Sequence, residues 1–283
     1  MGKKNRGQGS PTFEAIKHKN EQEKIKDEDR AQFHLMAPFG PSIGMVQLPK
    51  SILDNLLKAT DKILLDKDRI DWGTNLVGQI NEEPWVSNKV LEEIGVMEPL
   101  RTCIQQYTIA MLQRQGIDQE MIREVGVHLD HMWIVSQYEN EYNPIHYHTY
   151  CDLSAVLYLK VPDFKNRVEE KELPSYKNNK DGQIELVYKS ADANTCERGT
   201  LLIDPKPGML LLFPSNLLHT VYPFKGDGER RSVAFNSQWS AIKHDGSPLD
   251  KSVRIPTDQD HEKYREKLRS KGEVSRYAIE DNK

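Results

Sequence analysis

Residues 143–159, NPIHYHTYCDLSAVLYL, decide the fold that we expect for this chain. His146 and His148 are separated by one residue and stand directly before an apolar run that is typical of a strand. Residues two apart on a strand point to the same face of a sheet. The two imidazoles are therefore predicted to point the same way, as the ligands of one metal ion at the mouth of a β-barrel would.

Strand-like segments continue from about residue 130 to residue 240. They read HMWIVSQY, DLSAVLYLKV, QIELVYK, TLLI, GMLLLF, HTVYPF and RSVAFNSQW. Turn residues such as Pro205, Pro207 and Gly208 separate them, and no helical crossover fits between them. With the strand that carries the histidines, about eight strands are expected. The pattern favours a mainly β fold, an antiparallel jelly roll.

Two helices are predicted before the strands. Apolar residues recur at helical spacing between 52 and 64, after Ser51, which forms a capping-box-like start with Asp54. They recur again between 97 and 111. We expect these N-terminal helices to cover one outer face of the roll. The segment 70–95 is expected to be irregular, and it shows no pattern that can be assigned.

Composition divides the chain into four expected segments. They are a flexible charged arm at 1–33, a helical flanking region at 34–126, a β core at 127–241 and a charged tail at 242–283. The charged stretch 163–182 is expected to be an inserted loop near the barrel mouth.

Charge and hydropathy narrow the classes of function. The formal net charge is −4, so there is no clear nucleic-acid signal, and no apolar run approaches the roughly 20 residues of a membrane helix. The N-terminal MGKKNRGQGS lacks the apolar core of a secretory signal. Cys103, Cys151 and Cys196 are widely spaced, which supports neither a disulfide framework nor a zinc site. A cytoplasmic location is the expectation.

A third histidine, His219, opens the strand HTVYPF. In an eight-stranded roll the ends of the second and seventh strands lie side by side, which would bring His219 to His146 and His148. An open, nitrogen-rich site of this kind suits Fe(II). The alternative is that all three are strand-end histidines that form hydrogen bonds to loops.

Strand alternation divides RRSVAFNSQW into two faces. One face is small or polar, as the lining of a ligand cavity would be: Arg230, Ser232, Ala234 and Asn236. The other can pack beneath the helices: Arg231, Val233 and Phe235. An arginine fork with a hydroxyl two residues on can hold a carboxylate. The alternative is a solvent-facing arginine on an edge strand.

Together these motifs resemble the Fe(II)/2-oxoglutarate-dependent oxygenases. The resemblance rests on HYH at 146–148, LSAVLYL at 153–159, G-x-L-L-L-F-P-S-x-x-x-H from Gly208 to His219, and R-x-S from Arg230. It is greatest to a putative 2OG-Fe(II) oxygenase subgroup with an H-x-H…H…R-x-S pattern, and it covers about 130–240.

The resemblance implies a cupin-like double-stranded β-helix that binds Fe(2+) through His146 and His219. It further implies that Arg230 and Ser232 hold the distal carboxylate of 2-oxoglutarate, with Tyr158 as a candidate hydrogen-bond donor. The implied activity is that of a dioxygenase, an oxidoreductase that uses O2 and couples decarboxylation of 2-oxoglutarate to oxidation of a substrate. The motifs do not indicate that substrate.

The chain departs from the family at position 148, where most members have Asp or Glu. We expect His148 to be the third ligand, with Asp152 as the alternative carboxylate, although extended chain would place Asp152 roughly 13 Å away. His128 and Asp130 form a literal H-x-D, but they precede the first expected core strand. An ordinary helix-to-strand turn is predicted there.

The sequence is also compatible with two other functions. A cupin-type dioxygenase with three histidines would not use 2-oxoglutarate and would not need Arg230 or Ser232. A jelly-roll binding module without catalysis would bind no iron. Succinate production separates the first from the leading hypothesis, and iron binding separates the second.

Overall fold

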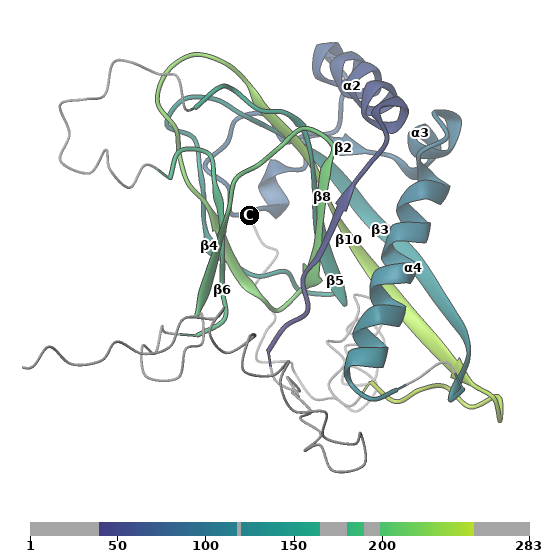
Figure 1. Ribbon diagram of the computed structural model, residues 1–283. Coiled ribbons are helices and arrows are strands. Elements are labelled where there is room, and N and C mark those ends of the chain that lie inside the picture. Colours follow the sequence, from purple (N-terminus) through teal and green to yellow (C-terminus); the bar gives the residue numbers. More distant parts are fainter. Residues whose placement is uncertain (1–39, 118–119, 165–179, 190–198, 252–283) are drawn as a thin grey trace, which may run out of the picture. The chain divides into compact units, whose positions relative to one another are not determined.

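Two antiparallel sheets face each other in the computed structural model of the chain (Figure 1). The structure describes residues 40–117, 120–164, 180–189 and 199–251. Within them, the larger sheet has the order β1 (Gly44–Gln47), β8 (Met209–Pro214), β5 (Leu153–Lys160), β10 (Arg230–Lys243), β3 (Ile122–Gln137) and β2 (Trp85–Val86). The smaller has the order β4 (Asn143–His146), β9 (Leu218–Val221), β6 (Ile184–Val187) and β7 (Thr200–Ile203).

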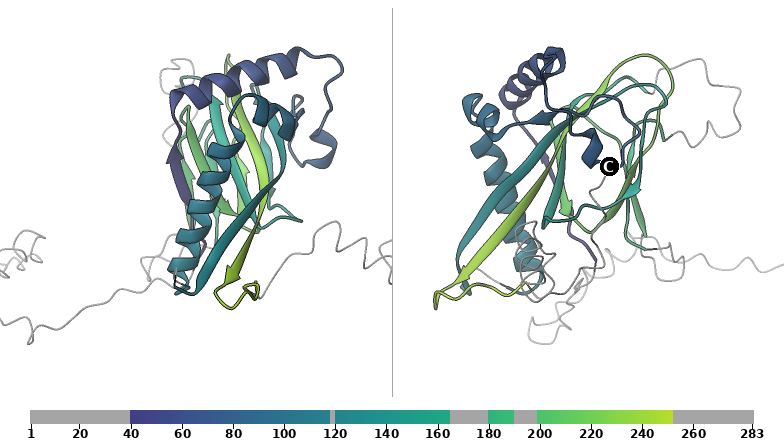
Figure 2. Two further views of the ribbon diagram at one scale, coloured as in Figure 1. Left: turned by 90° about the vertical axis from the view of Figure 1, so that its right-hand side faces the viewer. Right: turned by 180° about the vertical axis from the view of Figure 1, so that it is seen from behind.

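Helices cover the outer face of the larger sheet, as Figure 2 shows. They are α2 (Lys50–Leu65), α3 (Asn88–Glu93) and α4 (Met97–Arg114), and a 3₁₀ turn spans Gly73–Asn75. The prediction of a mainly β jelly roll, a double-stranded β-helix with N-terminal flanking helices, is confirmed.

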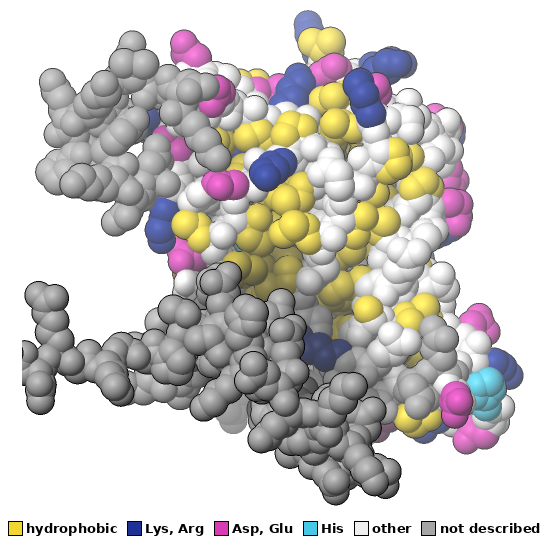
Figure 3. Space-filling view, in the orientation of Figure 1, with side chains coloured by type: hydrophobic (Ala, Val, Ile, Leu, Met, Phe, Trp, Pro, Cys, Tyr) yellow, Lys and Arg dark blue, Asp and Glu magenta, His cyan; other side chains and the backbone are white. Residues whose placement is uncertain are grey.

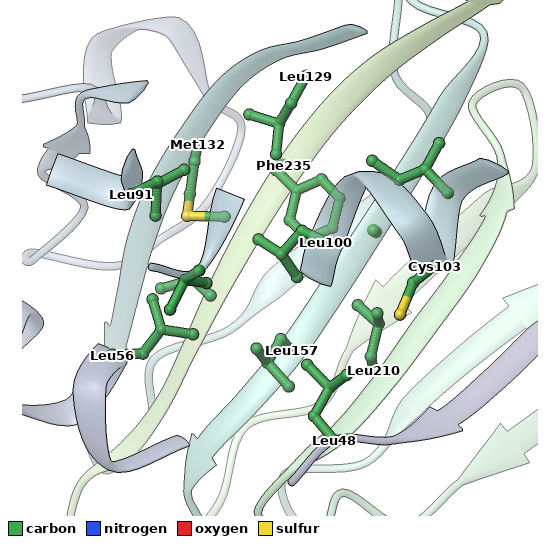
Figure 4. Packing of buried hydrophobic residues seen from close by; sticks show 14 of the residues in the cluster. Leu48, Leu56, Leu91, Leu100, Cys103, Leu129, Met132, Leu157, Leu210 and Phe235 are labelled. Atoms are coloured by element: carbon green, nitrogen blue, oxygen red, sulfur yellow. The ribbon is translucent and has the colours of Figure 1, made fainter. Parts of the chain in front are cut away.

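Alternation along β10 builds the core beneath the helices. Val233 and Phe235 are fully buried and pack in one cluster with Leu100 and Ile104 of α4 (Figure 4). Burial of each such side chain contributes about 1.5–3 kcal/mol, and a Phe235→Ala cavity would cost about 3–5 kcal/mol. The residues of β10 between them point to the opposite face, toward the smaller sheet.

A second apolar cluster, which includes Tyr158, Leu211, Phe213 and Val221, is drawn from both sheets. It fills only part of the space between them. The remainder is a cavity, described below with the site.

Two local predictions in the N-terminal region were wrong. Ser51 does not begin a capping box, because α2 begins at Lys50 after Pro49 and no side chain caps it. The segment 70–95 is not irregular throughout: it contains β2, in which Trp85 pairs with Trp133, and α3, whose cap Ser87 accepts a hydrogen bond from Val90 N at 3.3 Å. A two-residue strand is too short to show a period.

The predicted turn at His128 and Asp130 is also wrong. Both residues lie inside β3, which pairs with β10 along its whole length. His128 lies where β3 and β10 continue past their last β5 neighbour, and Asp130 lies at a bulge between the pairs His131–Asn236 and Leu129–Ser237. Both residues line the cavity, so polar side chains are compatible with strand at these positions.

The expected segment boundaries stay a prediction. The structure adds that β1 and β2, from the flanking region, pair into the larger sheet. The predicted arm at 1–33 lies outside the described residues, as do most of the tail at 242–283 and most of the loop at 163–182.

Side chains on the described surface are mixed in character. Figure 3 shows hydrophobic side chains gathered over the middle of one face, with charges of both signs toward its margins. In the described residues, no helix is long and apolar enough to cross a membrane.

Candidate active site

Three histidines meet where β4 and β9 pair. His146 is the last residue of β4 and is the direct cross-strand partner of His219 in β9. One ligand nitrogen from each of His146, His148 and His219 lies within 4.8 Å of the others. The structure thus brings together the three histidines that the sequence singled out, and in the described residues they form the sole group of this kind.

His148 reaches this group by a route that strand alternation did not foresee. It lies beyond the end of β4, and its backbone N–H donates to Ser215 O at 2.8 Å. Its ring stacks on Trp133, with 5.8 Å between the ring centroids. This imidazole is therefore oriented by a loop contact and an aromatic neighbour, and not by the hydrogen bonds between paired strands.

Hydrogen bonds orient each of the three rings. His146 Nδ1 lies 2.7 Å from Pro144 O, and His219 Nδ1 lies 2.9 Å from Leu217 O. Carbonyl oxygens only accept, so both Nδ1 atoms carry the proton and donate it. His148 Nδ1 is 2.8 Å from Asn236 Oδ1, another acceptor. In each neutral ring the Nε2 lone pair is left for a metal, the arrangement common around metal-binding histidines.

Burial keeps the rings uncharged. Desolvation lowers the pKa of His146, and it lowers the pKa of His148 to about 4 with a smaller contribution from His146. The pKa of His219 is well below its ordinary value for the same reasons. Neutral imidazole is the form that binds a metal ion.

The alternative ligand, Asp152, is engaged elsewhere. Its carboxylate accepts from Trp239 N at 3.0 Å and pairs with Lys251. Asp152 is also absent from the residues that line the cavity. Among the described residues, His148 is therefore the better candidate for the third ligand.

A cavity of about 780 Å³ opens beside the histidines and is lined from both sheets. The polar face of β10 lines it as predicted, with Arg230, Ser232, Ala234 and Asn236. Tyr158 of β5 lines it too, and is the cross-strand partner of Ser232. The proposed holders of 2-oxoglutarate thus share a cavity with the three histidines.

Arg230 is a buried cation whose guanidinium is only partly satisfied. It is 1% exposed, and its Nε donates to Gly182 O at 2.9 Å. Its Nη2 and the hydroxyl of Tyr158 are both buried without a hydrogen-bond partner in the described residues. Burial raises the pKa of Tyr158 to about 12, so its hydroxyl keeps its proton. Two hydrogen-bond donors are therefore left for a ligand with acceptor atoms.

Arg231 points to the other face, as alternation predicts. Its guanidinium donates to Glu229 at 2.8 Å, to Asp61 of α2 at 2.6 Å and to Thr60 at 3.0 Å. Its carboxylate partners are all outside the cavity. The two adjacent arginines therefore differ in one respect that matters for binding, since Arg231 has counter-ions and Arg230 has none within the described part of the chain.

The far wall of the cavity holds residues that sequence reasoning missed or set aside. His128 and Asp130, 3.7 Å apart, line it, and so do Trp72 and Glu83. No signal in the sequence marks Glu83, because it belongs to the edge of the larger sheet only through pairing with β3.

The comparison with family models finds one match, to the putative 2OG-Fe(II) oxygenases, over residues 131–236. A comparison with curated proteins found no match.

Several solved structures are similar to this chain at low identity. A prolyl-4-hydroxylase from Pseudomonas putida is 17% identical, covers 70% of this chain and 92% of its own, and has a TM-score of 0.43. A viral collagen prolyl hydroxylase from Paramecium Bursaria Chlorella virus-1, in a 2OG complex, is 17% identical, with 69% and 94% covered and a TM-score of 0.38. HygX from Streptomyces hygroscopicus, with nickel and 2-oxoglutarate bound, is 9% identical, with 70% and 81% covered and a TM-score of 0.39.

The similarity to these three solved structures carries no conclusion about activity. The family match is independent of them, because it compares amino-acid sequence. The matched residues begin in β3 and end in β10, so they span the paired ends of β4 and β9, the cavity face of β10 and all three histidines. By this match, residues 131–236 of the chain are similar to the putative 2OG-Fe(II) oxygenases.

Proposed function

We propose that this protein is an Fe(II)/2-oxoglutarate-dependent oxygenase, with His146, His148 and His219 as the metal ligands. One observation carries the proposal beyond the family match. Arg230 is buried, has no counter-ion among the residues that the structure describes, and opens into the cavity that the three histidines border.

Physical chemistry favours a carboxylate at this place. A buried charge without a partner is costly, and a bidentate carboxylate is the best match for a guanidinium. Tyr158 adds a second donor, and Ser232 faces it across the β5–β10 pair. A dicarboxylate such as 2-oxoglutarate could place one end on Arg230 and extend its other end toward the histidines.

The side chains have distinct roles in this proposal. When bound, Fe(II) supplies the redox chemistry that couples 2-oxoglutarate and O2 to substrate oxidation, with succinate and CO2 as coproducts. His146 and His219 hold the metal from two paired strands, and the Asn236 amide fixes the orientation of His148. Arg230 and Tyr158 bind and orient the co-substrate. Phe213, which meets His219 edge-on, helps to exclude water.

The experiment is the measurement of succinate formed from 2-oxoglutarate by Fe(II)-loaded protein under air. We expect succinate from the wild type and none above background from His219→Ala. A wild type that binds iron but neither binds nor consumes 2-oxoglutarate would contradict the proposal. That result would favour the dioxygenase with three histidines and no 2-oxoglutarate, for which the all-nitrogen ligand set is the supporting observation.

We also propose a cytoplasmic location. Cys103 and Cys151 are both free and buried, as thiols in a reducing compartment are.

A further inference from the structure

The acidic wall of the cavity points to the chemistry of the substrate. Glu83 lines the cavity, is 2% exposed, and its Oε2 is buried without a hydrogen-bond partner in the described residues. It also takes part in none of the ion pairs found there. A buried carboxylate normally has a cation or several donors. This one lines an open cavity, and among the residues that the structure describes it has neither.

Pairing with β3 fixes where Glu83 stands. Glu82 is bridged to Ser136 and Trp85 pairs with Trp133, so the same register sets Glu83 opposite Val135. Val135 pairs with Ser232, and Ser232 pairs with Tyr158. Four cavity residues thus form one row across the sheet, from Tyr158 to Glu83.

The two ends of this row have opposite charge. Arg230 is two residues from Ser232 on β10, and its guanidinium lies over the Tyr158 ring. Tyr158 and Glu83 are three strand spacings apart, roughly 14 Å. Trp133 belongs to the next row on the same face of the sheet, and its ring stacks on His148. The row from Tyr158 to Glu83 is therefore adjacent to the row that contacts a metal-binding histidine. A carboxylate ligand is attracted to one end of the cavity and repelled from the other.

The surroundings of Glu83 are anionic and aromatic. Asp71 and Glu141 repel its charge, and together with burial they raise the pKa of Glu83 to about 7. Trp72, whose ring lies 5.1 Å from that of His131, presents an aromatic surface to the same space.

The backbone holds Glu83 firmly in place. Its carbonyl accepts from Trp72 N at 3.0 Å, while the neighbouring Pro84 O accepts from Ile134 N at 2.9 Å. Gly78 packs so closely that a Cβ there would lie 3.0 Å from both Glu83 carboxylate oxygens. Gly78 therefore bounds the carboxylate on one side, and the cavity lies on another.

We propose that the substrate of this oxygenase carries a cationic amino or guanidino group, and that this group pairs with Glu83 at the end of the cavity opposite Arg230. Aromatic surfaces suit such a group, because the face of an indole or phenol ring attracts cations. Tyr147, which lines the cavity and is 54% exposed, is placed to contact the aliphatic stem. The inference rests on the proposed function, because it assigns the place of 2-oxoglutarate to the Arg230 end.

The test compares matched probes that differ in charge. The full chain is loaded with Zn(II) and 2-oxoglutarate, which permits binding without turnover, and titrated by calorimetry. The probes are agmatine and cadaverine, and capped pentapeptides with a central arginine, citrulline, lysine or norleucine between glycine and alanine. Binding of the free amines would assign a small-molecule substrate, and binding of the peptides alone would assign a protein side chain. Either result supports the cation site.

We expect the arginine or lysine probe to bind about 10-fold or more tightly than its neutral match, the value of one charge-assisted hydrogen bond. Glu83→Gln keeps the shape and should reduce this preference to about 2-fold or less. Glu82→Gln is the matched control, because Glu82 pairs with Arg69 and should leave the preference unchanged.

Equal binding of the charged and neutral probes to the wild type would overturn the inference, as would a preference that persists in Glu83→Gln. Succinate assays on the same proteins, loaded with Fe(II) in place of Zn(II), separate the two proposals. If 2-oxoglutarate is consumed and no cation preference exists, the inference alone fails. If the Glu83-dependent preference exists but 2-oxoglutarate neither binds nor reacts, the proposed function fails and Glu83 marks a cation-binding site only.

Discussion

The guanidinium carbon of Arg230 lies 5.0 Å from the centre of the Tyr158 ring, and the two side chains together leave two buried donors without partners in the described residues. Both come from adjacent strands of one sheet and open into one cavity. Stacking on the ring offsets part of the cost of burying the cation. The two donors without partners, Arg230 Nη2 and the Tyr158 hydroxyl, are therefore the groups in the cavity that are best suited to bind a carboxylate.

Arg230→Ala should weaken 2-oxoglutarate binding without removing the metal. Hydrogen bonds to charged groups contribute about 1.5–3 kcal/mol, which corresponds to a loss of roughly one to two orders of magnitude in affinity. The dissociation constant can be measured by calorimetry on metal-loaded protein, with metal content determined on the same sample.

Arg231→Ala is the control for the same measurement. Arg231 is bound to Glu229 and Asp61 outside the cavity, so its loss should lower the free energy of unfolding by about 3 kcal/mol and leave 2-oxoglutarate affinity nearly unchanged. A greater loss of affinity at Arg231 than at Arg230 would contradict the assignment of the two faces of β10.

Tyr158→Phe separates binding from stability. The hydroxyl has no partner in the described residues, so its removal should leave the unfolding free energy unchanged or slightly higher. The 2-oxoglutarate affinity should fall by about 5-fold, the value of one ordinary hydrogen bond. A large loss of stability would indicate instead that the hydroxyl supports the fold.

His219→Ala should abolish tight iron binding while the fold persists. The side chain is buried in the metal group, and two histidines without a third ligand bind divalent metals much more weakly. Iron content after gel filtration measures the loss, and circular dichroism checks the fold. Iron at the wild-type level in this variant would place the metal elsewhere.

His148→Asp should retain iron, because it supplies the carboxylate that most of the superfamily has at this position. His148→Leu, which has no ligand atom, is the paired variant and should lose most of the metal. Iron content that falls equally in both variants would show that an aspartate at 148 cannot reach the ion, and that the ring bound to Asn236 is needed for its length.

Strand alternation and topology predicted much of this arrangement. The period of two assigned Arg230 and Arg231 to opposite faces, and the order of strands in a jelly roll brought His219 to His146, its actual cross-strand partner. Both follow from regular structure, in which position along the strand determines direction. The fold was predictable for the same reason.

The positions of His148 and Glu83 could not be predicted, because regular secondary structure does not determine them. His148 is oriented by the Ser215 carbonyl and the Trp133 ring, which are distant in sequence and meet it only in the folded chain. Glu83 belongs to an edge whose strand, β2, is two residues long, so no periodicity marked its direction. That its carboxylate is buried without a partner among the described residues follows from three-dimensional packing. From the sequence alone, a charged residue in EEPW is expected to be exposed to solvent.

Glu83 should make the stability of the protein depend on pH. Its pKa is raised from 4.5 to about 7 in the folded state, mainly by burial and then by Asp71 and Glu141. Between these values the Glu83 carboxyl is more often protonated in the folded state than in the unfolded state, so its own contribution to the free energy of unfolding falls as pH rises. The full loss, reached above pH 7, is roughly 3 kcal/mol from a shift of this size.

Glu83→Gln removes this proton and its linkage. The variant should match the wild type near pH 4.5 and become progressively more stable than it up to about pH 7, a difference measured by urea unfolding at each pH. Glu82→Gln should show no such trend, because Glu82 is paired with Arg69. A difference between Glu83→Gln and wild type that stays constant across this range would mean that Glu83 ionises in the fold at no cost. A carboxylate that already has a compensating partner would behave in that way, and the cavity wall would then not be poised for a cation.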